Sequence, residues 1–288
     1  MNSSTLIDAA ELQRLLKSPQ PPVLLDCSFD LADPGAGRRA YMAGHLPGAH
    51  YLHLDDDLSS PRAAEGPRSP RFTGRHPLPD RQALAARIGG LGIARGTPVV
   101  AYDGQGSVYA SRAWWLLRWL GHDAVAVLDG GTAAWLAAGG SLSTDAVTAP
   151  GGAPYPASES PAMSAVDAAG LHASLGRVRV LDARAGERFR GEVEPLDPVA
   201  GHIPGATQRF FKDNLGDDGR FKPATRLRED FLALGAEGGP AVVHQCGSGV
   251  TACHNLLAME HAGLTGSALY PGSWSEWCAD PARPIARG

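Results

Sequence analysis

The sequence has few cysteines, few charges and no long apolar run. Only four of its 288 residues are cysteine, and no two of them form a C-x-x-C pair. Such sparse cysteines exclude a disulfide-stabilised scaffold and indicate free thiols in a reducing compartment, so we expect a cytoplasmic protein. No stretch reaches the roughly 18 apolar residues that a membrane helix needs, and residues 1–8 lack the features of a signal peptide. We therefore expect no membrane partner.

Charged residues are scarce as well. They make up 19% of the chain, with 26 basic and 30 acidic residues and a net charge of −4. No run of Lys or Arg stands out, so no nucleic-acid partner is expected. Hydrophobic residues reach 43% in a chain of 288 residues. A chain of that length is longer than one typical domain, and it has enough hydrophobic residues to fill the cores of two ordinary domains.

What the chain does contain is an internal repeat. The sequence AGHLPGA at residues 43–49 returns as AGHIPGA at residues 200–206. Further matches follow in the same order: residues 6–12 with 165–171, 23–26 with 179–182, Ala110 with Ala252, and Trp135 with Trp277. The last two pairs have equal separations (252 − 110 and 277 − 135), which predicts an alignment without gaps there. The order of the matches predicts two copies of one domain.

A run rich in proline, glycine and alanine separates the copies. It predicts an N-terminal domain over residues 1–147, a linker over 148–162 and a C-terminal domain over 163–288. In each copy, short apolar runs alternate with helical patterns. The expected strands are 98–102, 125–128, 241–245 and 268–270, and the expected helices are 110–120 and 251–262. This order is typical of an α/β fold with a mainly parallel sheet flanked by helices.

Cys246 is the strongest candidate for chemistry, because it follows an expected strand and precedes an expected helix. In open α/β sheets, ligands bind beyond the carboxyl ends of the strands. Gly247 and Gly249 can take positive φ, which lets the turn direct its N–H groups at the sulfur. Such surroundings stabilise a thiolate, and equally the terminal sulfur of a persulfide. The other cysteines are interpreted as buried thiols: Cys27, Cys253 and Cys278.

Three segments carry a family resemblance. The loop CGSGVTAC at residues 246–253, GHIPG at 201–205 and PGSWSEW at 271–277 are similar to two-domain rhodanese-like sulfurtransferases that use 3-mercaptopyruvate or thiosulfate. The duplication is similar too, and the resemblance covers nearly the whole chain. It implies two tandem rhodanese-like domains. It also implies that Cys246 is the nucleophile, that it carries sulfane sulfur as a persulfide, and that no metal or organic cofactor is needed.

The resemblance implies further site residues. The loop N–H groups would hold the persulfide: Gly247, Ser248, Gly249, Val250 and Thr251. Ser248 would also bond the donor or the leaving enolate. Arg188 matches a family arginine that binds the anionic donor, because a guanidinium can bond two oxygens at once. Arg184 and Arg190 are interpreted as surface residues.

Two residues of the first copy match family positions that face the cleft, Asp55 and His76. The histidine would relay a proton to the departing group and Asp55 would set its tautomer. The alternative is a structural hydrogen bond without a catalytic part. Gly104 takes the place of Cys246 in the gapless alignment (246 − 104 equals 252 − 110), so the first domain is expected to be inactive.

The donor is left open by two conflicting features. Family members that act on 3-mercaptopyruvate carry a second arginine shortly after Arg188, whereas residues 192–199 contain none. Gly247 and Ser248 are neutral, as in those members, while thiosulfate users carry cations there. The expectation therefore favours 3-mercaptopyruvate, with a thiosulfate-specific enzyme as the alternative. Expected acceptors are cyanide or a thiol, such as thioredoxin or a small thiol.

Other functions fit the sequence less well. A cysteine phosphatase needs an arginine six residues after its cysteine, and Ala252 stands there. A zinc site from His244, Cys246, Cys253 and His254 is not expected, because the last two are adjacent on a helix and face apart. A non-catalytic binding module of the same fold is the alternative from another class.

Overall fold

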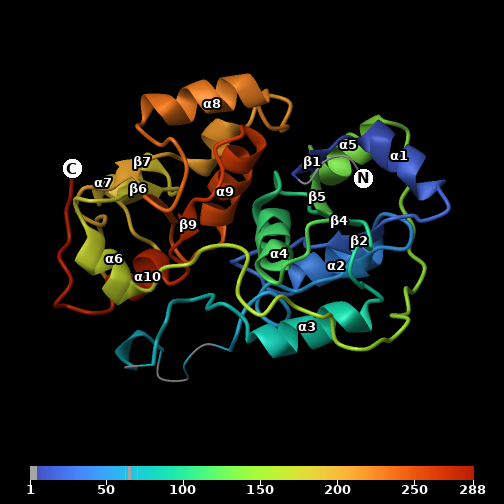
Figure 1. Ribbon diagram of the computed structural model, residues 1–288, viewed down its shortest axis with the longest axis horizontal. Helices are drawn as coiled ribbons and strands as arrows, with labels where there is room; N and C mark the ends of the chain where they lie inside the picture. Colours follow the sequence, from blue (N-terminus) through green and yellow to red (C-terminus); the bar gives the residue numbers. More distant parts are fainter. Residues whose placement is uncertain (1–4, 62, 64–65, 70) are drawn as a thin grey trace. The chain divides into compact units, whose positions relative to one another are not determined.

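The computed structural model describes all residues except 1–4, 62, 64–65 and 70. The chain forms two compact units (Figure 1). The first comprises Met1–Ser60, Pro79–Ala162 and Asp217–Arg220, and the second comprises Pro61–Leu78, Met163–Gly216 and Phe221–Gly288. A piece of the N-terminal half, 61–78, thus belongs to the second unit. The predicted linker at 148–162 stays a prediction.

The first unit contains a parallel sheet with the strand order β1-β5-β4-β2-β3. Its strands are β1 Leu6–Ile7, β2 Val23–Asp26, β3 His50–Tyr51, β4 Val99–Tyr102 and β5 Val125–Leu128. Every residue of β4 and β5 is buried. Continuous apolar strands of this kind are typical of a sheet that is covered on both faces.

The helices of the first unit are α1 Ala9–Leu16, α2 Ala36–Ala43, α3 Arg81–Gly90, α4 Val108–Trp119 and α5 Gly131–Ala137. Asp8 and Asp80 cap α1 and α3 by accepting backbone N–H groups of the first turn, which stabilises these helix starts. α4 packs on β4 and β5 and buries Trp114 and Trp115 completely.

The second unit contains a parallel sheet with the order β7-β6-β8-β9. Its strands are β6 Arg179–Asp182, β7 Thr207–Gln208, β8 Val242–Gln245 and β9 Ala268–Leu269. β8 lies between β6 and β9, and its residues are all buried. The residue after β8 therefore leaves the sheet from the middle of its carboxyl edge, where open α/β sheets bind ligands.

The helices of the second unit are η1 Gly66–Arg68, α6 Ala168–Ser174, α7 Gly186–Arg190, η2 Phe211–Asn214, α8 Ala224–Ala233, α9 Thr251–His261 and α10 Ser273–Trp277. α9 packs on β8 and against α8. Trp274 and Trp277 of α10 are fully buried in a core cluster with Tyr270. The tryptophans of both units thus fill cores, where large aromatic side chains contribute most to burial.

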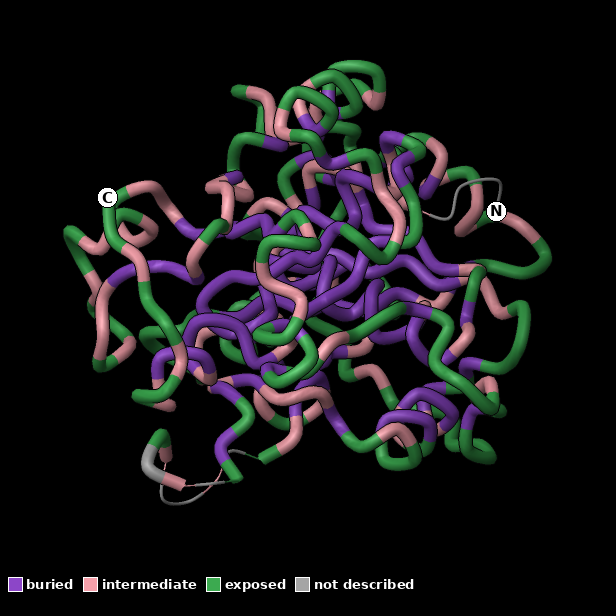
Figure 2. Tube along the Cα trace, turned by 60° about the vertical axis from the view of Figure 1, so that its left-hand side comes forward, coloured by how far each residue is buried: buried purple, intermediate pink, exposed green. Residues whose placement is uncertain are grey.

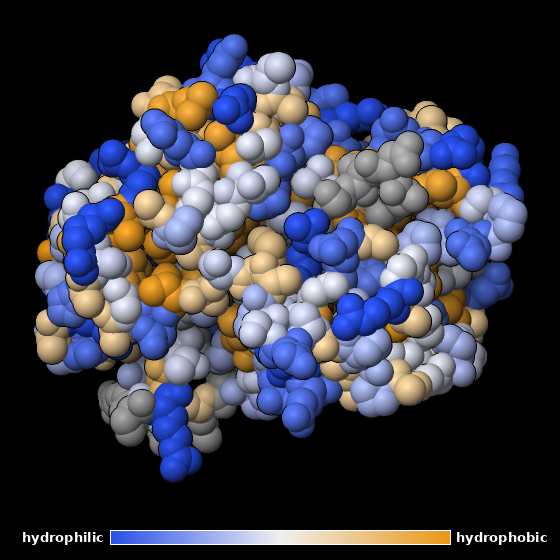
Figure 3. Space-filling view, in the orientation of Figure 1, coloured by the Kyte–Doolittle hydropathy of each residue, from blue (hydrophilic) through white to orange (hydrophobic). Residues whose placement is uncertain are grey.

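The expected α/β architecture is confirmed, with a parallel sheet flanked by helices in each unit. The strands expected at 98–102 and 241–245 and the helices expected at 110–120 and 251–262 appear within two residues of their predicted bounds. Buried stretches of chain run through the interior and exposed ones form outer loops (Figure 2). Figure 3 shows hydrophilic and hydrophobic residues intermixed on the face in view. Over the described residues, no helix is long and apolar enough to cross a membrane.

Candidate active site

Cys246 begins the loop that joins β8 to α9. β8 ends at Gln245 and α9 starts at Thr251, so the loop has five residues. The backbone N–H of Gly249 donates a hydrogen bond to the Cys246 sulfur across 3.1 Å, and Cys246 is only 2% exposed. An N–H group directed at a buried sulfur stabilises negative charge on that sulfur. This contact is compatible with the predicted thiolate or persulfide at Cys246.

The two glycines of this loop have different roles. Gly249 takes a φ of +78°, as predicted, and a Cβ there would lie 2.4 Å from the carbonyl oxygen of Pro271. Both the backbone and the lack of space exclude a side chain. The prediction was wrong for Gly247, which lies outside the left-handed region. A Cβ on Gly247 would instead lie 2.9 Å from Nη2 of Arg75. Gly247 is small because a guanidinium lies over it.

The segment that follows β9 fixes the backbone of the cysteine loop. The N–H groups of Trp274 and Ser275 donate to the carbonyl oxygens of Cys246 and Gly247, each across 3.0 Å. The N–H of Cys246 donates to Oγ of Ser273 across 3.1 Å. Donors and acceptors that are bonded in advance do not have to reorganise during the reaction. The loop is thus held in place before any donor arrives.

Ser248 meets His76 in the second unit. Oγ of Ser248 and Nδ1 of His76 lie 2.7 Å apart, and the two residues are 5% and 1% exposed. The tautomer of the histidine decides which atom donates. The segment that carries His76 is held against α10, because the N–H of Arg75 donates to Oγ of Ser275 across 3.1 Å. The structure thus brings together two residues that lie 172 positions apart.

Asp55 lies in the first unit, in the turn that follows β3. It is partly buried. Its predicted action on the tautomer of His76 stays a prediction, because the two residues belong to different units.

Arg188 of α7 is held by two carboxylates. Its Nη2 lies 2.7 Å from Oε1 of Glu194 and 3.5 Å from Oδ2 of Asp197. The side chain keeps 19% of its surface exposed, while Glu194 and Asp197 keep 3% each. A guanidinium with five N–H groups retains donors for a ligand after two such contacts. The geometry is compatible with the predicted binding of an anionic donor.

The interpretation of Arg184 as a surface residue was wrong. Its side chain is 1% exposed, bonds Asp182 at 2.7 Å, and lies 4.8 Å over the ring of Trp274. Burial opposes its charge, but the carboxylates of Asp182 and Glu194 outweigh burial and raise the pKa of Arg184. One sequence signal was missed: Arg184 comes two residues after β6, at the same sheet edge as Cys246. Arg190 is an exposed partner of Glu192, as interpreted.

Residues 192–199 lack the second arginine of the resembling family but supply two buried carboxylates, Glu194 and Asp197. Asp197 forms an ion pair with Arg75, whose side chain is 17% exposed. Burial raises the pKa of the Asp197 carboxyl, and the Arg75 guanidinium opposes that shift. Three cations thus meet three anions beside the cysteine loop: Arg75, Arg184 and Arg188 with Asp182, Glu194 and Asp197.

The equivalent loop of the first unit corrects the predicted pairing of Gly104 with Cys246. β4 ends at Tyr102 and α4 begins at Val108, so Asp103 is the first residue after the strand, as Cys246 is. Gly106 takes a φ of +75°, close to the +78° of Gly249. The spacing between equivalent positions of the two units is therefore 143 residues here (246 − 103) and 142 at the starts of α5 and α10 (273 − 131), because α9 has 11 residues and α4 has 12.

Asp103 supplies its own anion to that loop. Its carboxylate accepts the backbone N–H groups of Gln105, Ser107, Tyr109 and Ala110 at 2.8–2.9 Å. Asp103 is fully buried. A loop that turns its N–H groups inward is a recurrent anion-binding shape. The two loops have equal length but differ in shape, since Ser107 takes a φ of +66° where Val250 takes −86°; the first loop surrounds a fixed carboxylate, and the second carries a sulfur.

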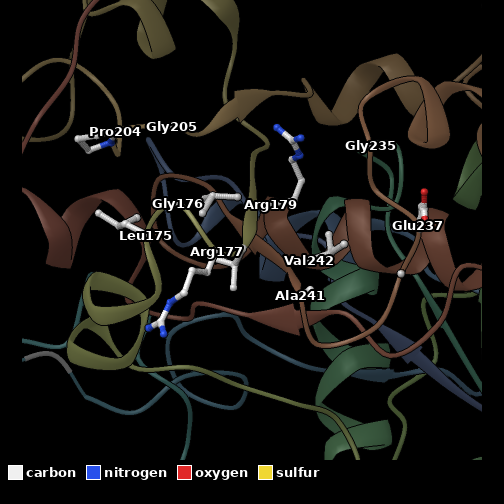
Figure 4. A pocket seen from close by; sticks show the side chains of 13 residues that line it. Leu175, Gly176, Arg177, Arg179, Pro204, Gly205, Gly235, Glu237, Ala241 and Val242 are labelled. Atoms are coloured by element: carbon white, nitrogen blue, oxygen red, sulfur yellow. The ribbon is translucent and has the colours of Figure 1, made fainter.

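A cavity of about 440 Å³ lies away from the cysteine (Figure 4). Its lining includes Arg179, the first residue of β6, and Val242, the first residue of β8. These are the amino ends of strands whose carboxyl ends lead to Arg184 and Cys246. Because the strands are parallel, the cavity lies at the opposite edge of the sheet from the candidate site.

Fold and loop together define a tandem α/β protein with one cysteine-bearing anion loop. The Rhodanese-like domain family matches residues 8–138 and 167–280. A Pseudomonas aeruginosa protein named "Probable 3-mercaptopyruvate sulfurtransferase" is 49% identical, over 100% of both chains. The thiosulfate sulfurtransferase of Bos taurus is 33% identical, over 88% of this chain and 84% of its own.

Solved structures agree with the sequence relatives. The crystal structure of SseA from Escherichia coli, titled for 3-mercaptopyruvate sulfotransferases, matches with a TM-score of 0.78 and 28% identity. The match covers 95% of this chain and 100% of SseA. The chain therefore belongs to the rhodanese family. Within that family it is a sulfurtransferase.

Proposed function

We propose that this sulfurtransferase moves sulfane sulfur from 3-mercaptopyruvate to cyanide or a thiol through a persulfide on Cys246. The observation that carries the proposal is the hydrogen bond from the Gly249 N–H to the Cys246 sulfur, in a loop whose backbone is bonded in advance. In this proposal the first domain is catalytically inactive, because Asp103 stands where Cys246 stands in the second. The location of the protein in the cytoplasm is a prediction from cysteine usage.

The first half-reaction loads the cysteine. The Cys246 thiolate attacks the sulfur of 3-mercaptopyruvate, a sulfur–sulfur bond forms, and the carbon–sulfur bond breaks. The electron pair of that bond stays on carbon as the enolate of pyruvate, which takes a proton and leaves as pyruvate. The loop N–H groups from Gly247 to Thr251 hold the sulfur, in the manner of an oxyanion hole.

Ser248 and His76 supply the proton for the enolate. Ser248 follows Gly247 in the loop, and its Oγ lies 2.7 Å from Nδ1 of His76. Ser248 donates to the enolate and is reprotonated by the histidine, which exchanges its proton with the bulk. The predicted help of Asp55, which belongs to the first unit, stays a prediction. The support for this relay is the buried Ser248–His76 contact.

The second half-reaction unloads the persulfide. Cyanide, or the thiolate of an acceptor such as thioredoxin or a small thiol, attacks the outer sulfur. The sulfur–sulfur bond breaks, and its electron pair returns to Cys246 as a thiolate. The products are thiocyanate or a new persulfide, and the enzyme is ready for another donor.

The names of the relatives divide between two donors. The Pseudomonas aeruginosa relative is named for 3-mercaptopyruvate and the bovine relative for thiosulfate. Gly247 and Ser248 are neutral, and the arginines next to them are balanced by buried carboxylates. Such surroundings suit a singly charged donor better than a dianion. A thiosulfate-specific enzyme is the second candidate, with sulfite as its leaving group, and a non-catalytic binding module is the alternative from another class.

The test compares Cys246→Ser with Cys278→Ser. Burial raises the pKa of Cys278 to about 12, so that thiol stays protonated and does not react. Each protein is mixed with 3-mercaptopyruvate or thiosulfate without an acceptor, and its intact mass is measured. We expect the wild type and Cys278→Ser to gain one sulfur atom and Cys246→Ser to gain none. No gain in the wild type with either donor would favour the binding module, and a gain in Cys246→Ser would refute the mechanism.

A further inference from the structure

Arg75 lies over the cysteine loop although it comes from the N-terminal half of the sequence. We propose that Arg75, together with Arg188, binds the carboxylate of the sulfur donor and selects an α-keto acid. This inference rests on the proposed function, because it concerns the donor of the same site. Family members that act on 3-mercaptopyruvate carry a second arginine shortly after Arg188, and residues 192–199 contain none. The inference assigns the role of that second arginine to Arg75.

Two guanidinium groups converge on one point above Gly247. A Cβ built on Gly247 would lie 2.9 Å from Nη2 of Arg75, and 3.5 and 3.6 Å from Nη1 and Nη2 of Arg188. The distance to Arg75 lies within the range of N–H···O hydrogen bonds, and the two distances to Arg188 lie just beyond it. A ligand oxygen placed between the two guanidiniums, one residue from Cys246, is therefore close to donors of both arginines. Charge-assisted bonds from two guanidiniums are a strong way to hold a carboxylate.

Asp197 positions Arg75 for this task. Its Oδ1 forms the ion pair with Nη1 of Arg75, and its Oδ2 lies 3.5 Å from Nη2 of Arg188. Asp197 is 3% exposed, so the carboxylate is a fixed support. Over the part of the chain that the structure describes, no protein group accepts a hydrogen bond from Nη2 of Arg75 or Nη1 of Arg188. These N–H groups are the donors that remain for a ligand.

The segment that carries Arg75 is fixed on both sides of it. Gly74 takes a φ of +103°, and a Cβ there would lie 2.7 Å from the carbonyl oxygen of Gly272. His76 bonds Ser248, and the N–H of Arg75 bonds Ser275. A binding group held on a fixed backbone loses little conformational entropy when the ligand arrives. The same segment thus contributes a binding cation and a proton donor to adjacent points of the loop.

The charge balance indicates which donor fits. The three arginines are matched by three buried carboxylates, so the cluster has no surplus positive charge. A ligand bound there gains directed hydrogen bonds rather than strong attraction to a net charge. Burial of charge without compensation is costly, and the cost increases with the charge. The single negative charge of an α-keto carboxylate suits this site better than the double charge of thiosulfate.

The experiment separates the two half-reactions. Since a persulfide divides the reaction, kcat/KM for the donor reports the loading step and kcat/KM for cyanide reports the unloading step. The variants are Arg75→Gln and Arg75→Lys. The lysine keeps a positive charge for the ion pair with Asp197. It lacks the planar fork of N–H groups with which a guanidinium can bond a second carboxylate. The matched control is Arg190→Gln, which alters an exposed arginine two residues from Arg188.

The expected result is a loss confined to the donor. Arg75→Gln should lower kcat/KM for 3-mercaptopyruvate by about 10- to 100-fold, the effect of losing charge-assisted hydrogen bonds. Arg75→Lys should lower it by about 10-fold, and Arg190→Gln should leave it unchanged. For both Arg75 variants, kcat/KM for cyanide should stay within about twofold of the wild type. An unchanged kcat/KM for 3-mercaptopyruvate would overturn the inference. An equal fall in kcat/KM for 3-mercaptopyruvate and for cyanide would also overturn it, because it would indicate a structural role for Arg75.

A binding measurement distinguishes this inference from the proposed function. 3-Mercaptopyruvate is titrated into Cys246→Ser with and without Arg75→Gln, so no chemistry takes place. Weaker binding in the double variant supports the inference even if the wild type forms no persulfide, a result that would overturn the proposed function alone. Equal binding by the two proteins would overturn the inference and leave the persulfide mechanism intact.

Discussion

Asp103 and Cys246 occupy the same position in the two units. Each is the first residue after a buried central strand, and each accepts a backbone N–H group from the loop that leads to the next helix. The carboxylate of Asp103 accepts four backbone N–H groups, two from the loop and two from the first turn of α4, so it is the built-in anion of its loop. Cys246 places a sulfur there instead, which the proposed mechanism loads and unloads as a persulfide. The duplicated fold thus has a fixed carboxylate after the central strand of one unit and a thiol after the central strand of the other.

This relationship predicts that Asp103 stabilises the first unit. Asp103→Ala leaves four backbone N–H groups without their acceptor, two in the loop and two in the buried first turn of α4. An unsatisfied buried donor costs about 1–3 kcal/mol, so we expect the free energy of unfolding to fall by at least about 3 kcal/mol. Urea denaturation measures the change. Asp123→Ala, an exposed partner of Arg118, is the control and should change stability by less than about 0.5 kcal/mol. Equal stabilities of the two variants would contradict the assignment.

The relay between Ser248 and His76 predicts non-additive kinetics. Ser248→Ala and His76→Gln should each lower kcat for 3-mercaptopyruvate by about 10- to 100-fold, since each interrupts the same proton transfer. The double variant should be no slower than the slower single variant. A double-mutant cycle on kcat measures this coupling. Thiosulfate is the control donor: sulfite leaves without needing a proton, so turnover with thiosulfate should fall less. Additive losses would show that the two residues act separately.

His244 predicts acid sensitivity of the second unit. It is fully buried in β8, its ring has no hydrogen-bond partner among the described residues, and burial lowers its pKa to about 3. The unfolded chain binds a proton at this residue below about pH 6.5, whereas the folded chain stays neutral until about pH 3. Stability is therefore lost as the pH falls through 6.5. Between about pH 7.5 and 5.5 the loss from this residue should be about 1.4 kcal/mol.

The measurement for His244 is chemical denaturation of the wild type and His244→Met at both pH values. The methionine does not titrate, so the variant should lose about 1.4 kcal/mol less than the wild type over this interval. The comparison removes the contribution of the carboxyl groups, which titrate in both proteins. If both proteins lose the same free energy of unfolding, His244 is protonated in the folded state as readily as in the unfolded one.

Periodicity and repetition predicted most of the fold. Alternating apolar runs and helical patterns predicted β4, β8, α4 and α9, because continuous burial leaves a local signature in the sequence. The position of Cys246 after β8 followed from the same reasoning. The pairing of Gly104 with Cys246 failed by one residue, because a one-residue difference in length between α4 and α9 is invisible where the two copies share few residues.

The sequence by itself determined the α/β class, the duplication and the nucleophile candidate, since these depend on local pattern and on residues that are neighbours in the chain. Only the tertiary structure decided which arginines lie at the cysteine. Arg184 is buried in ion pairs with Asp182 and Glu194. Arg75 reaches the cysteine loop because residues 61–78 belong to the second unit. Ion pairs such as Arg75–Asp197 join residues 122 positions apart. Their partners are chosen by packing and by the cost of burying an unpaired charge, which no local pattern records.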